Sequence, residues 1–238
     1  MIYRLNNINI NKEPFLYGFS DGYIDFKTGN GSSRTKLLKN IMKLTRKDDI
    51  SIHEIEQVHG DKIAFLEDFH FDVVSGGYDG MFTATSGKVL CVRTADCIPV
   101  LFFDGINGIT GALHCGWKGI YKDIILNAAG ILRSRSLFDL SGVISIIGPS
   151  ICRNCFEVKE DFMSKFTQKD KNSVSFMHQK YGKTYFDLKG FLKYQLVSSG
   201  FEAKNIYDMN KCTFEDKKFF SYRRDKTEKR QVSYILLV

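Results

Sequence analysis

The alternation of apolar and polar positions predicts short strands in the first third of the chain. Residues 2–10 and 15–19 have strand spacing, and another strand is expected at about residues 50–58. Between them, the turn-type segment 29–31 precedes Ser32 or Ser33, either of which is expected to cap a helix. The apolar residues at helical spacing in this helix are Leu37, Leu38, Ile41 and Met42.

Apolar runs of strand length dominate the middle of the chain. Residues 89–92 and 98–103 are two such runs, and a further strand begins at Ile109 after turn-type Asp-Gly and Asn-Gly pairs. This pattern predicts a hairpin over residues 98–113. A helix is expected next, with one apolar face formed by Ile120, Ile124, Ile125, Ala128 and Leu132.

The last part of the chain mixes both kinds of element. We expect a buried strand at residues 143–147, a helix at 157–166 and a closing strand at 232–238. Asp187 is expected to cap another helix, and Gly200 suits the position just after its end. Because helices and strands do not strictly alternate, the sequence predicts an α+β fold rather than a doubly wound sheet.

Length and composition fit one globular domain, which we expect to span residues 1–238. The 238 residues contain no repeat and no low-complexity linker, and 43% hydrophobic with 26% charged residues excludes wholesale disorder. No apolar stretch approaches the roughly 18 residues of a membrane span, so no membrane partner is expected. The net charge of +7 is mild, and we attribute most of it to compositional bias rather than to a nucleic-acid partner.

The six cysteines raise the question of disulfide bonds. The first residues lack the apolar core of a signal peptide, so we expect a cytoplasmic protein with reduced thiols. Cys152 and Cys155 form a Cys-x-x-Cys with only the remote Cys212 as a third ligand, and two reduced thiols in a turn are the simpler interpretation.

Three residues at predicted strand ends could carry chemistry: His59, Cys97 and His114. Two imidazoles and a thiolate are zinc ligands, and a fourth position occupied by water is typical of catalytic zinc. The same residues could instead form a cysteine nucleophile with a histidine base. Both chemistries need a deprotonated sulfur beside imidazole, and the residues alone leave both open.

Basic residues near these strand ends are candidates for anion binding. Lys118 follows two glycines at a predicted helix start, where backbone N–H groups attract anions. Arg223 and Arg224, with Arg230 nearby, belong to the densest basic cluster, and arginine suits phosphate or carboxylate recognition.

Eight ordered segments together resemble the YfiH family, also called the polyphenol oxidoreductase laccase family, which includes the animal protein FAMIN. The resemblance runs from about residue 15 to the end of the chain. The segments are Gln57-Val58-His59-Gly60, Asp79-Gly80-Met81-Phe82-Thr83, Thr94-Ala95-Asp96-Cys97-Ile98-Pro99, His114-Cys115-Gly116-Trp117-Lys118-Gly119, Ile147-Gly148-Pro149-Ser150-Ile151, Cys155-Phe156-Glu157-Val158, Cys212-Thr213 and Ser221-Tyr222-Arg223-Arg224-Asp225.

The resemblance implies a layered α+β sandwich of mixed sheets flanked by helices, similar to a deamidating toxin domain. It also implies a metal site at His59, Cys97 and His114, with zinc as the usual metal and copper as the alternative. The implied substrates are a purine nucleoside and phosphate, and the implied activities are phosphorolysis of adenosine, inosine or methylthioadenosine and deamination of adenosine. A bacterial member is linked to peptidoglycan editing.

Several roles follow as expectations from this resemblance. Lys118, Arg223 and Arg224 are expected to bind substrate, and Asp79 and Asp96 to orient the ligand histidines. The family usually has Ala and Arg where this chain has Cys115 and Lys118, and lysine lacks the bidentate fork of arginine.

Besides a non-catalytic binding protein, two rival enzymatic functions remain at this stage. One is a cysteine hydrolase that cleaves a cell-wall peptide amide with Cys97 as nucleophile. The other is a copper-dependent phenol oxidase, but five histidines cannot supply the several copper centres of a multicopper enzyme.

Overall fold

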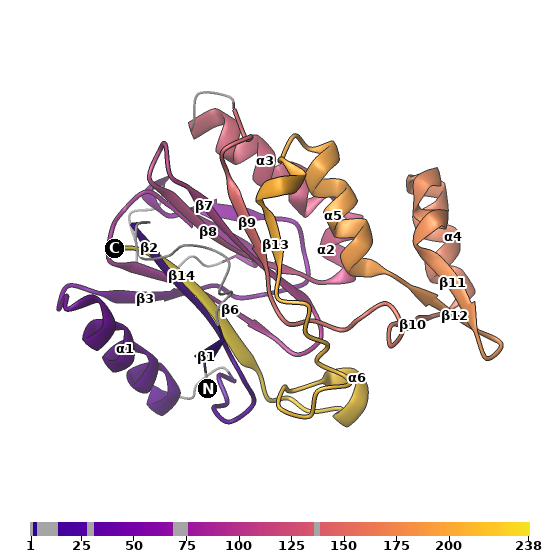
Figure 1. The fold of residues 1–238 in the computed structure, drawn as a ribbon, viewed down its shortest axis with the longest axis horizontal. Coiled ribbons are helices and arrows are strands. Elements are labelled where there is room, and N and C mark those ends of the chain that lie inside the picture. Colours follow the sequence, from indigo (N-terminus) through magenta and orange to yellow (C-terminus); the bar gives the residue numbers. More distant parts are fainter. Residues whose placement is uncertain (1, 4–13, 28–30, 69–75, 136–138) are drawn as a thin grey trace.

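The computed structural model describes residues 2–3, 14–27, 31–68, 76–135 and 139–238, whose strands form three sheets (Figure 1). The first sheet is mixed, because β3 and β6 run parallel while the other neighbours are antiparallel. Its five strands, in spatial order, are β1 (Ile2–Tyr3), β2 (Phe15–Ser20), β14 (Gln231–Leu237), β6 (Lys88–Thr94) and β3 (Ser51–Glu54).

The second sheet contains the predicted hairpin. Its central strands β7 and β8 are antiparallel, and Ile98 lies opposite Cys115 at the open end of the hairpin, away from the turn that follows Asp104. The six strands, in spatial order, are β13 (Ile206–Asp208), β9 (Ile144–Ile147), β7 (Ile98–Asp104), β8 (Ile109–Cys115), β5 (Gly80–Thr83) and β4 (Ile63–Phe65). A small third sheet comprises β10 (Glu157–Val158), β12 (Lys183–Phe186) and β11 (Met177–Lys180).

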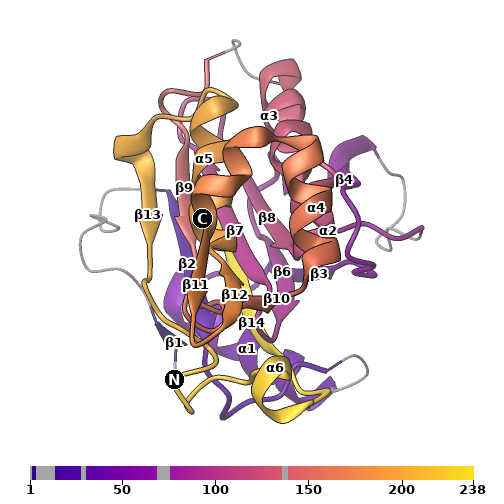
Figure 2. The ribbon, with the colours of Figure 1, turned by 90° about the vertical axis from the view of Figure 1, so that its right-hand side faces the viewer.

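Helices cover the outer faces of the two large sheets. Figure 1 places α1 on one side of the molecule and α3 and α5 on the other, and Figure 2 shows α3, α4 and α5 in front of the second sheet. The α-helices are α1 (Gly31–Thr45), α2 (Trp117–Tyr121), α3 (Ile124–Arg135), α4 (Glu160–Lys169), α5 (Leu188–Ser198) and α6 (Tyr222–Asp225). Short 3-10 turns span Leu66–Asp68, Lys171–Phe176 and Ala203–Asn205.

Three apolar cores hold these layers together. The middle core lies between the two large sheets and includes Phe19 from β2 and Leu101 from β7. A second core joins α1 to the first sheet through Ile41, and a third joins α3 and α5 to the second sheet through Ala128 and Leu192. Because removal of such side chains from water is the main favourable contribution to folding, the chain settles as a helix–sheet–sheet–helix sandwich. The expected α+β sandwich is confirmed.

Three element boundaries differ from the predictions. The strand expected over residues 50–58 ends at Glu54, where the chain turns toward the second sheet. The helix expected from Ile120 is interrupted at Asp123, which has φ +67°, so α2 and α3 are separate. The helix expected from residue 157 begins at Glu160, because Glu157 and Val158 pair with β12.

The capping predictions also have mixed outcomes. Asp187 accepts a hydrogen bond from the Gly190 N–H at 2.9 Å, and Gly200 follows the helix with φ +94°, as expected. Helix α1 already begins at Gly31, so Ser32 and Ser33 lie in its first turn rather than before it.

Two further observations complete the fold. Of the strand predicted at residues 2–10, positions 4–10 lie outside the described residues. Among the described helices, none combines the length and hydropathy required to cross a bilayer.

Candidate metal centre

Three side chains from distant parts of the sequence converge at one point. The imidazole nitrogens of His59 and His114 and the Sγ of Cys97 all lie within 4.8 Å of one another. The two imidazole rings are nearly perpendicular, with centroids 4.7 Å apart. His59 is exposed, Cys97 is half-buried and His114 is buried, so the group is open to solvent on one side only.

The hairpin explains why Cys97 and His114 are neighbours. Cys97 directly precedes β7, and His114 lies near the end of β8 opposite Pro99. Antiparallel pairing within this hairpin therefore brings the two residues together across the strand register. Gly116 then permits close approach, since a Cβ there would lie 2.9 Å from Cδ2 of His59 and 3.3 Å from Sγ of Cys97.

A single buried carboxylate positions both histidines. Asp79 accepts hydrogen bonds from the backbone N–H groups of Val58, His59 and Gly60 at 3.1, 2.9 and 2.5 Å. Its Oδ1 is also 2.7 Å from Nδ1 of His114. With Nδ1 engaged, Nε2 of His114 is the nitrogen available as a ligand, which is the usual arrangement for histidine at a metal.

Gln57 fixes the loop that carries His59. Its amide nitrogen donates to the Arg93 carbonyl at 2.8 Å, and its amide oxygen accepts from the Arg93 N–H at 2.8 Å. The side chain thus continues the pairing of β6 after β3 has ended. His59 adopts φ +59°, a left-handed conformation that the Asp79 and Gln57 contacts hold in place.

The side chains of Cys97 and His114 favour a thiolate–imidazolium pair. Burial raises the pKa of the Cys97 thiol, but the charge and hydrogen bonds of His114, with a hydrogen bond from His59, outweigh it and bring the pKa to about 6. Burial lowers the pKa of His114, but Cys97 and Asp79 raise it to about 9. Hydrogen bonds from His114 and the Gly60 N–H hold the pKa of Asp79 below its usual value, against the opposing effect of burial.

The donor set fits a soft or borderline metal ion. Two imidazole nitrogens and one thiolate are ligands that zinc and copper accept, and hard cations such as Mg²⁺ prefer oxygen. The Cys97 thiolate is already favoured by its neighbours, but a bound cation would displace the Nε2 proton of His114, whose pKa is about 9. His59, Cys97 and His114 can therefore hold a zinc ion with one position open.

Asp96 has contacts different from those we expected. Its Oδ1 accepts from the Thr213 hydroxyl at 2.7 Å, and its Oδ2 accepts from the Arg223 N–H at 2.6 Å. The carboxylate thus secures the C-terminal segment beside the site instead of orienting a ligand histidine. Asp96 itself adopts φ +95°, which directs Cys97 toward the histidines.

His59, Cys97 and His114 form part of the wall of a cavity of about 910 Å³. Basic side chains from several segments line it: Lys27, Arg93, Lys159, Arg223 and Arg230. Aromatic side chains line it as well: Trp117, Phe156, Phe162 and Tyr222. A cavity of this size with apolar walls and convergent polar groups is typical of a small-molecule site.

Of the three basic residues predicted to bind substrate, only Arg223 lines this cavity. Its guanidinium stacks over the Phe156 ring at 5.1 Å and donates to the Glu157 carbonyl at 2.9 Å. Lys118 is exposed and lies over the Trp117 ring at 5.7 Å, outside the cavity lining.

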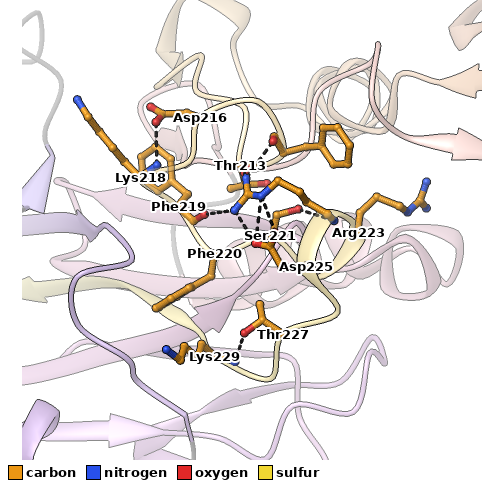
Figure 3. Close-up of polar contacts among 12 residues, drawn as sticks. Thr213, Asp216, Lys218, Phe219, Phe220, Ser221, Arg223, Asp225, Thr227 and Lys229 are labelled. Atoms are coloured by element: carbon orange, nitrogen blue, oxygen red, sulfur yellow. Dashed lines mark hydrogen bonds and ion pairs between the residues drawn. The ribbon is translucent and has the colours of Figure 1, made fainter.

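Arg224 makes structural contacts instead. Its guanidinium donates to the carbonyls of Thr213, Phe214 and Phe219 and pairs with Asp225. Figure 3 labels Thr213, Phe219 and Asp225 among these partners. In Figure 3, Arg223 extends away from this network of contacts. Arg223 and Arg224 are adjacent in the sequence, but Arg223 lines the cavity and Arg224 binds backbone carbonyls.

Sequence reasoning missed several cationic wall residues. Arg93 and Arg230 come together because β14 pairs with β6, with Val232 opposite Arg93. Burial lowers the pKa of Arg93 below its usual value, and the nearby charges of Arg34 and Arg230 add to the effect. The only sequence signal was that Arg93 directly precedes the Thr94–Cys97 motif.

Comparison with known proteins places these features in a family. The profile of the multi-copper polyphenol oxidoreductase laccase family matches residues 18–238. A purine nucleoside phosphorylase of Rickettsia conorii is 32% identical over 186 residues, which cover 76% of this chain and 75% of that protein. The purine nucleoside phosphorylase YfiH of Escherichia coli is 30% identical over 185 residues, covering 77% and 73%.

Solved structures agree on the fold. The protein YfiH of Bacillus licheniformis has a TM-score of 0.80 at 24% identity and covers 97% of this chain and 94% of its own. YlmD of Geobacillus stearothermophilus has a TM-score of 0.81 at 22% identity, covering 94% and 92%. The profile match over nearly the whole length, together with the two relatives at 30% identity or more, leads to one conclusion: the chain belongs to the multi-copper polyphenol oxidoreductase laccase family.

Proposed function

We propose that this protein is a zinc-dependent purine nucleoside phosphorylase whose metal is held by His59, Cys97 and His114. The observation that carries the proposal is the meeting of this trio, aromatic side chains and arginines in one cavity of about 910 Å³. A nucleoside needs an apolar surface for its base, and phosphate needs cationic donors. The names of the relatives support the same activity.

Phosphate is proposed to bind where arginines face the cavity. Arg93 and Arg230 carry like charges close together, so an anion between them would reduce their repulsion. Arg223 belongs to α6, and its guanidinium lies over the Phe156 ring. Guanidinium groups offer paired N–H donors that match phosphate oxygens, which favours these arginines over the exposed Lys118.

The base is proposed to lie against aromatic side chains. Trp117 and Phe162 have ring centroids 5.5 Å apart, and Phe156 and Phe162 have centroids 5.7 Å apart. A purine has a π-face that stacks on such rings. These residues belong to the helical side of the cavity, and Arg93 and Arg230 come from the first sheet, so base and phosphate would enter from different walls.

In phosphorolysis, a phosphate oxygen forms a bond to the ribose C1′ while the bond from C1′ to the purine nitrogen breaks, and the base leaves with a proton. A bound zinc ion supplies Lewis-acid stabilisation of developing negative charge. The chain itself holds the anionic nucleophile with arginines and keeps His114 oriented through Asp79.

Incubation of the zinc-loaded protein with adenosine and phosphate tests this proposal. Chromatography that resolves adenine, inosine and hypoxanthine separates the possible reactions. Adenine formation that depends on phosphate supports phosphorolysis, and inosine formation indicates adenosine deamination at the same site. Absence of turnover with adenosine, inosine and methylthioadenosine contradicts the proposal.

The cysteine-hydrolase alternative rests on the low pKa of Cys97. It predicts that a metal-free protein remains active on a cell-wall peptide amide and loses activity after alkylation of Cys97. The zinc proposal predicts that activity, zinc content or both are lost in Cys97→Ser and kept in Cys91→Ala, because Cys91 lies in the core between α1 and the first sheet. Copper replaces zinc in the phenol-oxidase alternative, which phenol turnover by the copper-loaded protein would support.

A further inference from the structure

A second group of metal-type side chains lies outside the cavity. The Sγ atoms of Cys152, Cys155 and Cys212 and a carboxylate oxygen of Glu215 all lie within 4.8 Å of one another. The Cys152 and Cys155 sulfurs are 3.5 Å apart, and the Cys155 sulfur is 3.4 Å from Oε1 of Glu215. None of these four residues lines the cavity that contains His59, Cys97 and His114.

We propose that Cys152, Cys155, Cys212 and Glu215 bind a second, structural zinc ion. In a tetrahedral zinc site with bonds of about 2.3 Å to sulfur, ligand atoms are separated by about 3.8 Å. The observed separations lie close to that value. They are also far longer than a disulfide bond of about 2.05 Å, so the arrangement is that of free thiols facing a common centre.

The spacing of the ligands matches this chemistry. A Cys-x-x-Cys turn supplies two ligands from one loop in many structural zinc sites. Sequence reasoning favoured reduced thiols in a turn because Cys212 is remote in the chain, but the fold removes that objection. The closed set of four protein ligands leaves no open position, which distinguishes it from the His59, Cys97 and His114 centre.

Backbone contacts hold the two loops together around this group. Ser150 and Cys212 form an isolated parallel bridge, in which the Thr213 N–H donates to the Ser150 carbonyl at 3.1 Å. The Cys152 N–H donates to Sγ of Cys212 at 3.4 Å. Bonds from backbone N–H groups to sulfur stabilise a thiolate and orient it, as is usual around metal-bound cysteine.

The proposed zinc ion would fasten one wall of the substrate cavity. Ile151 and Phe156 line the cavity and directly adjoin Cys152 and Cys155 in the sequence. On the other loop, Thr213 contacts Asp96, which also binds the Arg223 N–H. Crosslinking the loops through a metal would therefore fix the positions of the Phe156 ring and the Arg223 guanidinium that stacks on it.

Metal counting on the full chain tests the proposal. The protein is produced with zinc, freed of loosely bound metal, and analysed for zinc per chain by mass spectrometry. About two zinc ions per chain are expected, with about one in Cys155→Ser, one in Cys97→Ser and none in the double variant. The matched control Cys91→Ala is expected to keep both, because Cys91 belongs to neither group.

Two results would overturn the proposal. One is a single zinc per chain in the wild-type protein that Cys155→Ser leaves unchanged. The other is a disulfide between Cys152 and Cys155, found by peptide mapping without reduction, which would identify a redox pair instead.

A cobalt experiment keeps the test decisive if Cys155→Ser does not fold. In Cys97→Ser, the proposed site is the remaining place where several thiolates meet among the described residues. Replacement of zinc by cobalt in this variant is expected to give near-ultraviolet charge-transfer absorption of the strength typical of three thiolate ligands. Absence of that absorption would contradict the proposal.

Discussion

The carboxylate of Asp79 and the imidazole of His114 meet at 2.7 Å in a contact buried from solvent on both sides. The same carboxylate receives three backbone N–H groups from the loop of His59. One side chain therefore sets the positions of two of the three metal-type residues.

Replacement of this carboxylate should weaken metal binding more than it disrupts the fold. Asp79→Asn has one oxygen fewer to accept hydrogen bonds, and its NH₂ group faces N–H donors. We expect a loss of zinc affinity of about 10- to 100-fold. The free energy of unfolding should fall by about 2 kcal/mol because buried donors lose their partner. Chelator competition and urea unfolding measure the two effects, with the exposed Asp139→Asn as control.

Substitution of Gly116 should separate the ligands without removing any of them. The added Cβ of Gly116→Ala would lie 2.9 Å from the His59 ring and 3.3 Å from the Cys97 sulfur. We expect zinc affinity to fall at least tenfold while the circular dichroism spectrum stays unchanged.

Gly130 offers a matched control for that substitution. A Cβ at Gly130, in α3, meets no atom within 4 Å. Gly130→Ala should bind zinc normally and gain about 1 kcal/mol of stability, since alanine favours a helix over glycine. Equal zinc affinity in the Gly116 and Gly130 variants would contradict the crowding argument.

The reactivity of Cys97 in the metal-free protein should depend on pH with a low midpoint. Because its pKa is about 6, the thiol is protonated and slow below that pH and a reactive thiolate above it. An ordinary cysteine titrates near 8.5. In His114→Ala the main source of the shift is gone, so the midpoint should move upward.

Alkylation with iodoacetamide followed by peptide mapping measures this midpoint. Mapping is required because Cys212 also has a pKa lowered to about 6, chiefly by its hydrogen bond with Cys152. Zinc should protect Cys97 at each pH at which it stays bound to the deprotonated ligands. A midpoint near 8.5 in the metal-free wild-type protein would refute the proposed thiolate–imidazolium pair.

Loss of an arginine that lines the cavity should mainly weaken the binding of phosphate. Hydrogen bonds to charged groups contribute about 1.5–3 kcal/mol, so Arg230→Ala should raise the KM for phosphate by roughly 10- to 100-fold. The KM for the nucleoside should change much less, because Arg230 lies on the sheet side of the cavity. Arg135→Ala, which removes an exposed arginine paired with Asp68 outside the cavity, should leave both values unchanged.

Much of the fold could be predicted because local patterns agree with the final packing. The hairpin was predicted from apolar runs and turn pairs, and its register confirms it. The break at Asp123 and the short strand at Glu157 were missed, since both depend on tertiary contacts that no periodicity records.

The site was predicted less completely from the residues alone. His59, Cys97 and His114 were candidates from their places at predicted strand ends, but only the resemblance favoured a shared metal site, because their spacing shows nothing of the strand register that brings them together. Arg93 was missed for the same reason, and Arg230 was noted only as a neighbour of the Arg223 and Arg224 cluster, because the pairing of β14 with β6 is a contact between the middle and the end of the chain.

The division of the metal ligands between a hairpin and a loop has a consequence for assembly. Cys97 and His114 come together through contacts local in sequence, which form early in folding. His59 joins them only after its loop docks on Asp79 and Arg93. With the proposed zinc site, an incompletely folded chain would offer an incoming ion only the two ligands Cys97 and His114, and retention of zinc would report that the two sheets have packed against each other.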